Sequence, residues 1–237
     1  MMSLKNEFAI SGNWLFKHRS YLPLIILPLL FYSLFTPVGI SFNFLFYIGM
    51  SISLIGECIR IITVAFVPAG TSGRNTKQQK ASSLNQTGIY SIVRHPLYLG
   101  NFFIMLGPFI ITGNIYGIII FILSFWIYYE RIMYAEEIFL IAKFGGEYEN
   151  WSSNTPAFIP NFRLYTQPRS RFTFRKVLER EYSGMYGIIF IFTLLLIFRN
   201  YNLNITPIIS NAWKGIFLGN TLIYITLRTL KKIRRKK

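Results

Sequence analysis

The sequence contains no aspartate, and its 237 residues include only one cysteine and two histidines. All nine acidic residues are glutamates, so an aspartate base or a cluster of aspartate ligands is excluded. Cys58 cannot form a disulfide within the chain, and with His18 and His95 it falls short of the four ligands of a typical zinc site. We therefore expect a protein without a metal cofactor.

Charged side chains are also scarce, at 14% of the residues, whereas hydrophobic residues make up 52% and aromatic residues 18%. A soluble domain carries about 25% charged residues, so this chain has too little polar surface to cover a water-soluble core. Its 25 lysines and arginines give a net charge of +16, which is also typical of nucleic-acid-binding proteins. The long apolar runs favour an integral membrane protein and argue against a nucleic-acid partner.

Six apolar segments approach the roughly 20 residues that a helix needs to cross about 30 Å of hydrocarbon. The third and fourth are separated only by residues 113–115, which indicates a tight helical hairpin, with one kinked helix as the alternative. We predict an all-α, polytopic membrane bundle of about six transmembrane helices in a single domain, 1–237. The six segments are 21–35, 44–67, 97–112, 116–129, 184–198 and 216–227, and residues 184–229 form an extra C-terminal helical pair.

Basic residues divide unequally between the two sides of this bundle. The N-terminal segment, the second loop, the fourth loop and the C-terminal tail together hold 22 lysines and arginines, whereas the opposite side has Arg199 and Lys214. Cytoplasmic loops of membrane proteins are enriched in these residues. The six-span arrangement therefore predicts that both termini lie in the cytoplasm.

Arg94 and His95 lie near the end of a polar stretch, 68–100. They precede Pro96, and proline is favoured at the first position of a helix. The two side chains are therefore expected at the positively polarised N-terminus of the third span, where an anion is stabilised. The alternative is a belt of interfacial residues that binds no ligand.

Glu136 and Glu137 lie in a second polar stretch, 130–162, where apolar residues at helical spacing continue the helix of the fourth span. Glutamates this near the bilayer need partners. We expect Arg94, His95 or a cationic ligand to be those partners. The alternative is an Arg–Glu ion pair that only fixes two helices.

Four further charged residues are candidates for substrate binding. Glu57 and Arg60 stand three residues apart on one helical face of the second span. Ionisable residues inside a membrane are functional candidates, but an internal pair that holds the helix packing is expected about as often. Arg74 and Lys77 lie in a loop rich in glycine and hydrogen-bond donors, which would attract a phosphorylated head group.

The motifs in residues 88–100, 136–137 and 144–160, in this order, resemble the isoprenylcysteine carboxyl methyltransferase and phospholipid methyltransferase superfamily. The match covers residues 68–160, which we predict to be the cofactor-binding and catalytic core. The resemblance implies a compact helical enzyme that binds S-adenosylmethionine at the cytoplasmic face of the membrane and takes a lipid substrate from the bilayer. It rests on Gly88-x-Tyr90-x3-Arg94-His95-Pro96-x-Tyr98-x-Gly100, Glu136-Glu137, Phe144-Gly145-x-Glu147-Tyr148, Pro156 and Pro160.

With this resemblance, Arg94, His95 and Glu137 are the residues expected to be catalytic. The superfamily also has an arginine shortly before the paired glutamates, and Arg131 is displaced from that position by about one residue. The residues expected to bind the cofactor are Tyr90, His95, Pro96, Tyr98, Gly100, Glu136 and Tyr148. Those expected to bind the substrate are Arg74, Lys77, Glu57, Arg60 and Trp151.

The flanking segments 14–21 and 73–76 and the C-terminal pair resemble the bacterial lipid A 1-phosphate methyltransferase branch of this superfamily. This finer resemblance implies O-methylation of an anionic lipid group, a lipid A-type phosphate, in a bacterial inner membrane. An anionic oxygen is already a nucleophile. Alignment and desolvation can therefore promote the displacement without a general base.

Other activities stay open at this point. One is an isoprenylcysteine-type carboxyl methyltransferase, and another is a phospholipid N-methyltransferase, whose amine acceptor must first lose a proton. A third is an NADPH-dependent, sterol-reductase-like enzyme with a similar His-Pro-x-Tyr segment, although Glu136 and Glu137 favour the methyltransferase. The last is a membrane protein without enzymatic activity, and the sequence leaves the oligomeric state open.

Overall fold

The computed structural model describes residues 3–35, 39–68, 79 and 81–234. Within these ranges the chain forms eight α-helices, two 3₁₀-helices and no β-strand, which confirms the predicted all-α class. The α-helices are α1 (Leu4–His18), α2 (Leu22–Ser33), α3 (Phe42–Phe66), α4 (Pro96–Thr112), α5 (Ile115–Phe144), α6 (Gly146–Asn154), α7 (Phe174–Asn202) and α8 (Asn211–Arg234), and the 3₁₀-helices are η1 (Ile89–Ser91) and η2 (Phe162–Leu164).

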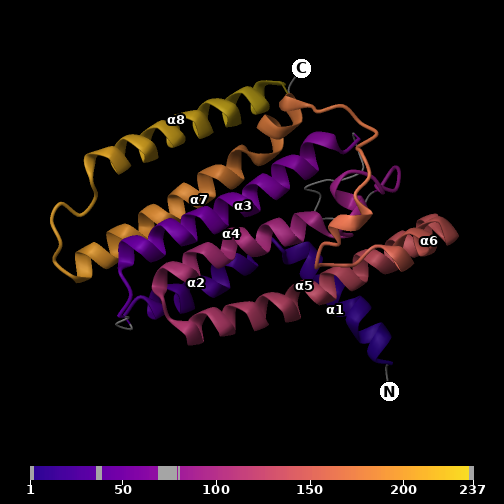
Figure 1. Ribbon diagram of the computed structural model, residues 1–237, viewed down its shortest axis with the longest axis horizontal. Coiled ribbons are helices and arrows are strands. Elements are labelled where there is room, and N and C mark those ends of the chain that lie inside the picture. The colour runs from indigo at the N-terminus through magenta and orange to yellow at the C-terminus, as the bar shows by residue number, and fades with distance from the viewer. Residues whose placement is uncertain (1–2, 36–38, 69–78, 80, 235–237) are drawn as a thin grey trace.

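The long helices lie side by side in the order α8, α7, α3, α4 and α5 (Figure 1), and each contacts the next. α2 packs against α4 and α5, and α1 packs along the part of α5 beyond α2. The turn that precedes α4, the helix α6 and the segment after it gather at one end of the bundle. That end carries the residues singled out in the sequence.

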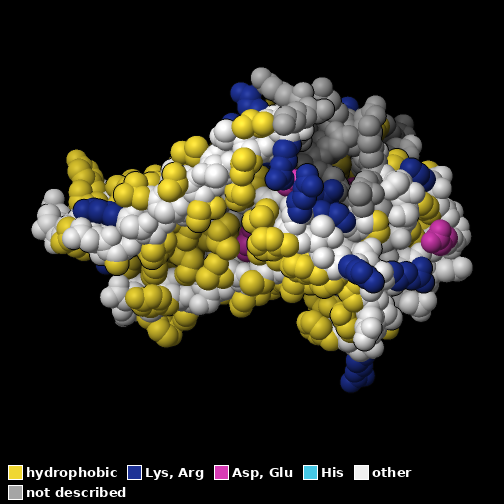
Figure 2. All heavy atoms as spheres, turned by 90° about the horizontal axis from the view of Figure 1, so that it is seen from above, with side chains coloured by type: hydrophobic (Ala, Val, Ile, Leu, Met, Phe, Trp, Pro, Cys, Tyr) yellow, Lys and Arg dark blue, Asp and Glu magenta, His cyan; other side chains and the backbone are white. Residues whose placement is uncertain are grey.

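Three helices, α3, α5 and α7, are long and apolar enough to cross a membrane. Shorter apolar helices at Leu24–Ser33 and Pro96–Thr112 correspond to the first and third predicted spans. In the face drawn in Figure 2, hydrophobic side chains cover one half of the molecule, and most of the visible lysines and arginines lie on the other half. An integral membrane protein is therefore supported. The sixth predicted span, 216–227, lies in α8, which is not among the long apolar helices of the described residues, so the count of six stays a prediction.

α4 and α5 form the expected hairpin rather than one kinked helix. Gly113 ends α4 in the left-handed conformation, with φ of 64°, which glycine adopts without a steric penalty. The Asn114 side chain then accepts hydrogen bonds from the backbone N–H groups of Tyr116 and Gly117 and so caps α5. α5 continues without a break to Phe144, so the fourth span and the paired glutamates share one rigid helix.

α3 and α4 approach each other closely because small residues face each other across their interface. A Cβ atom on Gly56 would lie 2.6 Å from the Gly100 carbonyl oxygen, and one on Gly100 would lie 2.5 Å from Arg60 Cγ. Small residues allow such close packing between membrane helices. The structure thus gives Gly100, predicted to bind the cofactor, a packing role against α3.

This interface gives a test of the packing. Gly107→Ala places a Cβ against the Gly49 backbone carbonyl, so we expect a loss of about 1–3 kcal/mol in the free energy of unfolding. Thermal unfolding in detergent measures it. The control is Gly215→Ala on α8, where an added Cβ has no atom of the described chain within 4 Å. Equal melting temperatures for the two variants would contradict the close packing of α3 on α4.

The sequence analysis did not predict α1. Its Gly12 packs on the backbone carbonyl of Arg131 in α5. Arg131 Nη1 donates a hydrogen bond of 3.2 Å to Ser11 Oγ, and its guanidinium lies 4.9 Å from the Phe8 ring centre. Arg131 therefore serves the contact between α1 and α5, and α1 leads directly to Arg19 at the candidate site.

Candidate active site

The turn that begins α4 is held by the chain segment after α6. The Arg94 N–H donates to the Pro156 carbonyl at 2.9 Å, and the His95 N–H donates to the Ala157 carbonyl at 3.2 Å. In the other direction, the Asn161 N–H donates a hydrogen bond of 2.9 Å to the Ile92 carbonyl. The backbone on both sides of the turn is therefore fixed before any ligand binds.

The same segment also holds the loop that carries Tyr90. Gly88 has φ of 65°, in the region that favours glycine, and its N–H donates to the Thr166 carbonyl at 3.0 Å. The Thr166 N–H donates to Ser91 Oγ at 2.9 Å. η1, with Tyr90 at its centre, is thus attached on both sides to residues from beyond α6.

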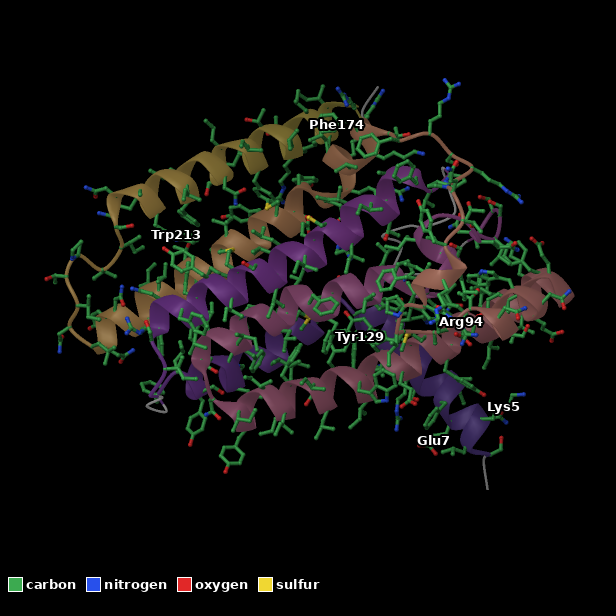
Figure 3. All side chains as sticks on the ribbon, viewed as in Figure 1. Lys5, Glu7, Arg94, Tyr129, Phe174 and Trp213 are labelled. Atoms are coloured by element: carbon green, nitrogen blue, oxygen red, sulfur yellow. The ribbon has the colours of Figure 1, made fainter. Side chains whose placement is uncertain are left out.

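Glu137 of α5 receives two cationic partners from this turn. Its Oε1 lies 3.0 Å from His95 Nε2 and 3.1 Å from Arg94 Nε. Arg94 Nη1 also donates a bond of 2.7 Å to the Ser152 carbonyl of α6. The structure thus brings together the three residues predicted to be catalytic and fixes the guanidinium of Arg94 from two helices. Figure 3 shows Arg94 at the end of the bundle where α6 begins.

Glu136 forms a second, adjoining cluster. Its Oε1 accepts a hydrogen bond of 2.7 Å from the Tyr98 hydroxyl and lies 3.7 Å from Arg19 Nη1. Its Oε2 lies 3.7 Å from His95 Nδ1. The two ring nitrogens of His95 therefore face two different carboxylates, which makes His95 the link between the clusters.

These carboxylates change the protonation of their neighbours. Burial by itself would lower the pKa of His95, but the nearby carboxylates of Glu136 and Glu137 outweigh burial and raise this pKa above its ordinary value of 6.5. Burial and the nearby Glu136 charge raise the pKa of Tyr90, and burial and the Glu137 charge raise that of Tyr148. The two carboxylates therefore favour the protonated form of His95, and both tyrosines stay neutral phenols.

The raised pKa predicts how stability depends on pH. Because the pKa of His95 is raised in the folded state, protonation of His95 stabilises the fold. This contribution is fully present below pH 6.5, the ordinary pKa of histidine, and is lost as the pH rises through the raised pKa. We expect the melting temperature of the wild type to exceed that of His95→Gln at low pH, and this excess to shrink as the pH rises. His18→Gln, at an exposed histidine, is the control and should show a constant difference. A His95→Gln difference that grows with pH would contradict the assignment.

A cavity of about 1150 Å³ opens beside these clusters. Glu137 and Tyr148 are not among its lining residues and lie behind the wall, where Glu137 orients Arg94 and His95. The predicted site residues that line the cavity are Arg60, Tyr90, Arg94, His95, Pro96, Tyr98, Glu136 and Trp151.

The cavity continues from this polar end into an apolar groove. One wall comes from α2, including Leu27 and Leu30, and the opposite wall from α7, including Ile188 and Leu194. α4 contributes Met105 to the lining. A single cavity can therefore hold a charged group and an attached hydrocarbon chain.

Apart from Arg94 Nε, which is ion-paired with Glu137, two buried donors on the cavity wall have no hydrogen-bond partner among the described residues. They are the indole Nε1 of Trp151, on α6, and the amide Nε2 of Gln79. An unsatisfied buried donor costs about 1–3 kcal/mol, and a ligand with acceptor atoms would remove that cost. Sequence reasoning had singled out Trp151 and had missed Gln79.

Glu57 and Arg60 of the second span were expected to bind substrate or to form an internal ion pair, and in the structure both contact α7. Arg60 forms a bidentate ion pair with Glu181 of α7, at 3.0 and 3.1 Å, and donates a bond of 2.7 Å to Asn101. Glu57 is only 1% exposed and packs against Gly184, one turn further along α7. The pair therefore fastens α3 to α7, while Arg60 also lines the cavity. Arg74 and Lys77 lie outside the described residues.

Besides Gln79, the lining residues missed in the sequence include Arg19, Asn101, Arg180 and Glu181. Arg180 and Glu181 come from α7, and Arg19 follows α1. For these three, the only local signal was a charge at the membrane end of an apolar run, where basic residues usually mark topology, and Asn101 has no charge. Their place at the site depends on contacts between distant parts of the chain.

Comparison with known proteins gives matches to one group. Residues 44–147 match the family model described as phospholipid methyltransferase. The protein-S-isoprenylcysteine O-methyltransferase of Schizosaccharomyces pombe is 33% identical over 125 residues, 50% of this chain and 52% of that protein. The protein of the same name from Rattus norvegicus is 30% identical over 115 residues, 47% and 40% of the two chains. A probable protein-S-isoprenylcysteine O-methyltransferase from Oryza sativa subsp. indica is 30% identical over 120 residues, which are 49% of this chain and 62% of that protein.

The chain thus spans about half the length of the curated relatives it matches. The matched family segment ends just before Tyr148 and Trp151 and excludes α1, α7 and α8. No solved structure matches the chain. The predicted resemblance to this superfamily is confirmed.

Proposed function

Because residues 44–147 match the phospholipid methyltransferase family model, and similar proteins are named protein-S-isoprenylcysteine O-methyltransferases, we propose that this protein is an S-adenosylmethionine-dependent membrane methyltransferase. Its acceptor is an anionic oxygen of a lipid or lipid-anchored molecule. The observation that supports the proposal most directly is the single cavity that joins the His95 and Glu136 clusters to an apolar groove.

The donor set of the cavity fits this cofactor. S-adenosylmethionine carries an ammonium and a sulfonium, which suit the Glu136 carboxylate and the faces of Tyr90 and Tyr98. It also carries a carboxylate and adenine nitrogens, which suit the buried N–H donors of Trp151 and Gln79. When bound, the cofactor supplies an electrophilic methyl group.

The residues of the chain then bind, align and exclude water. Glu137 holds Arg94 and protonated His95 in place, so two cationic groups face the cavity with little freedom to move. The apolar groove keeps water from the reacting oxygen, which strengthens both interactions. A phosphate or carboxylate acceptor needs no base, which agrees with a site whose one imidazole faces two carboxylates that favour its protonated form.

The charge of the cavity supports an anionic acceptor. Four arginines and protonated His95 line it, whereas its acidic lining residues are Glu136 and Glu181. Such an excess of positive charge disfavours an amine acceptor, which would have to enter as a further cation. The arginines are Arg19, Arg60, Arg94 and Arg180.

Within that class we propose a lipid phosphate of the lipid A type as the acceptor. A phosphate monoester carries a charge of about −1.5 to −2 near neutral pH, so it gains more from four arginines than a carboxylate does. Arg74 and Lys77 are proposed to attract this head group from the loop beside the site. A prenylcysteine carboxylate is the second candidate, favoured by the names of the relatives.

The rival readings make different use of the same residues. A sterol-reductase-like enzyme would place the phosphates of NADPH against the arginines, but NADPH has no cationic group for the Glu136 carboxylate, whereas S-adenosylmethionine has two. A scaffold without enzymatic activity has no need for two orphan donors beside a cationic cavity.

We also propose that the chain is one domain with both termini in the cytoplasm of a bacterial inner membrane. Residues 68–160 form its catalytic core, and 184–229 form an added helical pair. Reporter fusions at both ends test the orientation. Activity of a periplasmic reporter at either end would overturn it.

Mass spectrometry of total lipids, from cells with and without the gene, tests the proposed reaction. We expect one lipid class to gain a single methyl group only when the gene is present, and fragmentation to place that methyl on phosphate or on carboxylate. The same lipids from cells that carry Glu137→Ala should lack it. Identical lipid profiles with and without the gene, together with an absence of methyl transfer to lipid extracts in vitro, would overturn the proposal.

A further inference from the structure

Arg19 and Arg60 come from opposite sides of the bundle to the same cavity. Arg19 follows α1, whereas Arg60 lies on α3 next to α7, and both line the cavity. The floor between them includes the rings of Tyr98 and Tyr129, whose centres are 4.9 Å apart. Arg19 Nη1 lies 3.5 Å from the Tyr98 hydroxyl, and Arg60 donates to Asn101, whose amide donates to the Tyr129 hydroxyl. Figure 3 locates Tyr129 between α4 and α5. The two guanidinium groups therefore flank one small region.

Arg19 is held in this position by the docked N-terminal helix. Its guanidinium carbon lies 4.0 Å from the ring centre of Phe16, which is 5% exposed. Nη1 lies 3.5 Å from the Tyr98 hydroxyl and 3.7 Å from Glu136 Oε1. These contacts orient a side chain that would otherwise move freely at the membrane interface.

Arg60 is held from the opposite side by α7. Glu181 binds it in the bidentate manner, and the Asn101 side chain accepts from Nη1 at 2.7 Å. Asn101 itself donates a bond of 3.2 Å to the Tyr129 hydroxyl. A buried arginine with this many partners is rigid, and its three hydrogen bonds to Glu181 and Asn101 leave two of its five N–H donors for a ligand.

The two arginines stand where the polar and apolar parts of the cavity meet. α2 begins three residues after Arg19, and its Leu27 and Leu30 line the groove. On α4, Ile104 and Met105 line the cavity about one turn beyond Asn101. A chain that fills the groove between α2 and α7 would therefore bring its attached head group to the space between Arg19 and Arg60.

We propose that Arg19 and Arg60 form a clamp for the anionic head group of the acceptor, and that Glu181 is a positioning residue for Arg60. Guanidinium groups bind phosphate and carboxylate oxygens in fork geometry, so the clamp recognises the chemistry that these two groups share. The inference rests on the proposed function, because the clamped molecule is its acceptor. Arg19 and Glu181 both lie outside the matched segment 44–147, so acceptor selection is assigned to the parts of the chain that flank it.

The test measures binding of defined amphiphiles to the purified full chain in neutral detergent. The anionic probes are dioleoyl phosphatidic acid, which is a phosphate monoester, and N-acetyl-S-farnesylcysteine, which is a carboxylate. The comparison is phosphatidylcholine, a zwitterion without net charge. The first variant is Arg19→Gln. The second is a double variant, Arg60→Gln with Glu181→Gln, called the neutral pair, which avoids a buried unpaired carboxylate. Lys17→Gln, at an exposed residue of α1, is the matched control for loss of one positive charge.

We expect at least one anionic probe to bind the wild type more tightly than phosphatidylcholine. Arg19→Gln and the neutral pair should each weaken that binding by about 10- to 100-fold, the value of one charge-assisted hydrogen bond, and Lys17→Gln should not. The anionic probe that binds more tightly shows whether the site prefers a phosphate or a carboxylate head group. Equal binding of anionic and zwitterionic probes by the wild type, or unchanged binding by the arginine variants, would overturn the clamp.

A parallel measurement of S-adenosylhomocysteine binding keeps this test separate from that of the proposed function. The neutral pair, which contacts neither Glu136 nor Tyr98, should retain wild-type affinity for this compound within about twofold. A variant that loses cofactor affinity but keeps probe binding would assign the arginine to the cofactor and overturn the clamp. A wild type that binds anionic probes but neither S-adenosylhomocysteine nor any methyl donor would overturn the proposed function and leave the clamp standing.

Discussion

Replacement of Glu137 by alanine is expected to abolish most methyl transfer while the protein still folds and inserts. The change removes the carboxylate that holds Arg94 and His95, which leaves Arg94 with the Ser152 carbonyl and His95 with Glu136 at 3.7 Å. Breaking a buried ion pair costs about 3–5 kcal/mol, which corresponds to a loss of about 10²- to 10⁴-fold if it falls on the transition state. Transfer of labelled methyl from S-adenosylmethionine to lipid extract measures the effect, and His95→Ala should show a loss of similar size.

The matched control is Glu130→Ala, at an exposed glutamate two turns earlier on the same helix. It should retain wild-type transfer. If Glu137→Ala and His95→Ala both keep normal activity, these residues have a structural role only, and the enzymatic assignment of the cluster is wrong.

Replacement of Glu181 by glutamine is expected to give the largest loss of stability. Glu181 is 3% exposed, and without its charge Arg60 would keep a buried positive charge with no carboxylate in bidentate contact. The expected cost is about 3–5 kcal/mol in the free energy of unfolding. Thermal unfolding in detergent should give a clearly lower melting temperature than the wild type.

Glu179→Gln, two residues earlier on α7, provides the comparison. Glu179 binds Arg175 and Arg234 at the surface, and such exposed pairs contribute about 0–1 kcal/mol. Equal melting temperatures for Glu181→Gln and Glu179→Gln would mean that the contact between α3 and α7 is not stabilised by the Arg60 pair.

Local signals account for the parts of the fold that the sequence predicted well. Pro96 begins α4 because its ring suits the first position of a helix. Gly113, in the predicted turn 113–115, ends α4 with a φ of 64°, and Gly145 ends α5 with a φ of 51°. Such features depend on the conformational range of a few neighbouring residues, so they can be read without knowledge of the tertiary structure.

The helix α1 had a weaker local signal. Ser3 caps its first turn, and Phe8, Gly12 and Phe16 recur at helical spacing. Those features predict a helix, but they do not predict that it packs on α5. The docking depends on the fit of Gly12 against the Arg131 carbonyl, which is visible only in three dimensions.

The site shows the same division. The motif around His95 and the paired glutamates suggested which residues meet, and the structure brings them within 3.0 to 3.7 Å. The partner of Arg60 could not be inferred, because Glu181 is 121 residues away and Glu57 offered a carboxylate on the same helix. Pairing over such distances is decided by how α7 packs on α3, which charge patterns alone do not determine.

Equilibrium binding of S-adenosylhomocysteine to the full chain in detergent, with NADPH as the competing ligand, tests the cofactor assignment most directly. The cavity with its paired glutamates and the orphan donors of Trp151 and Gln79 predicts that S-adenosylhomocysteine binds, that Trp151→Phe weakens it by about 3- to 100-fold, and that NADPH does not compete. Tight binding of NADPH without binding of S-adenosylhomocysteine would contradict the account.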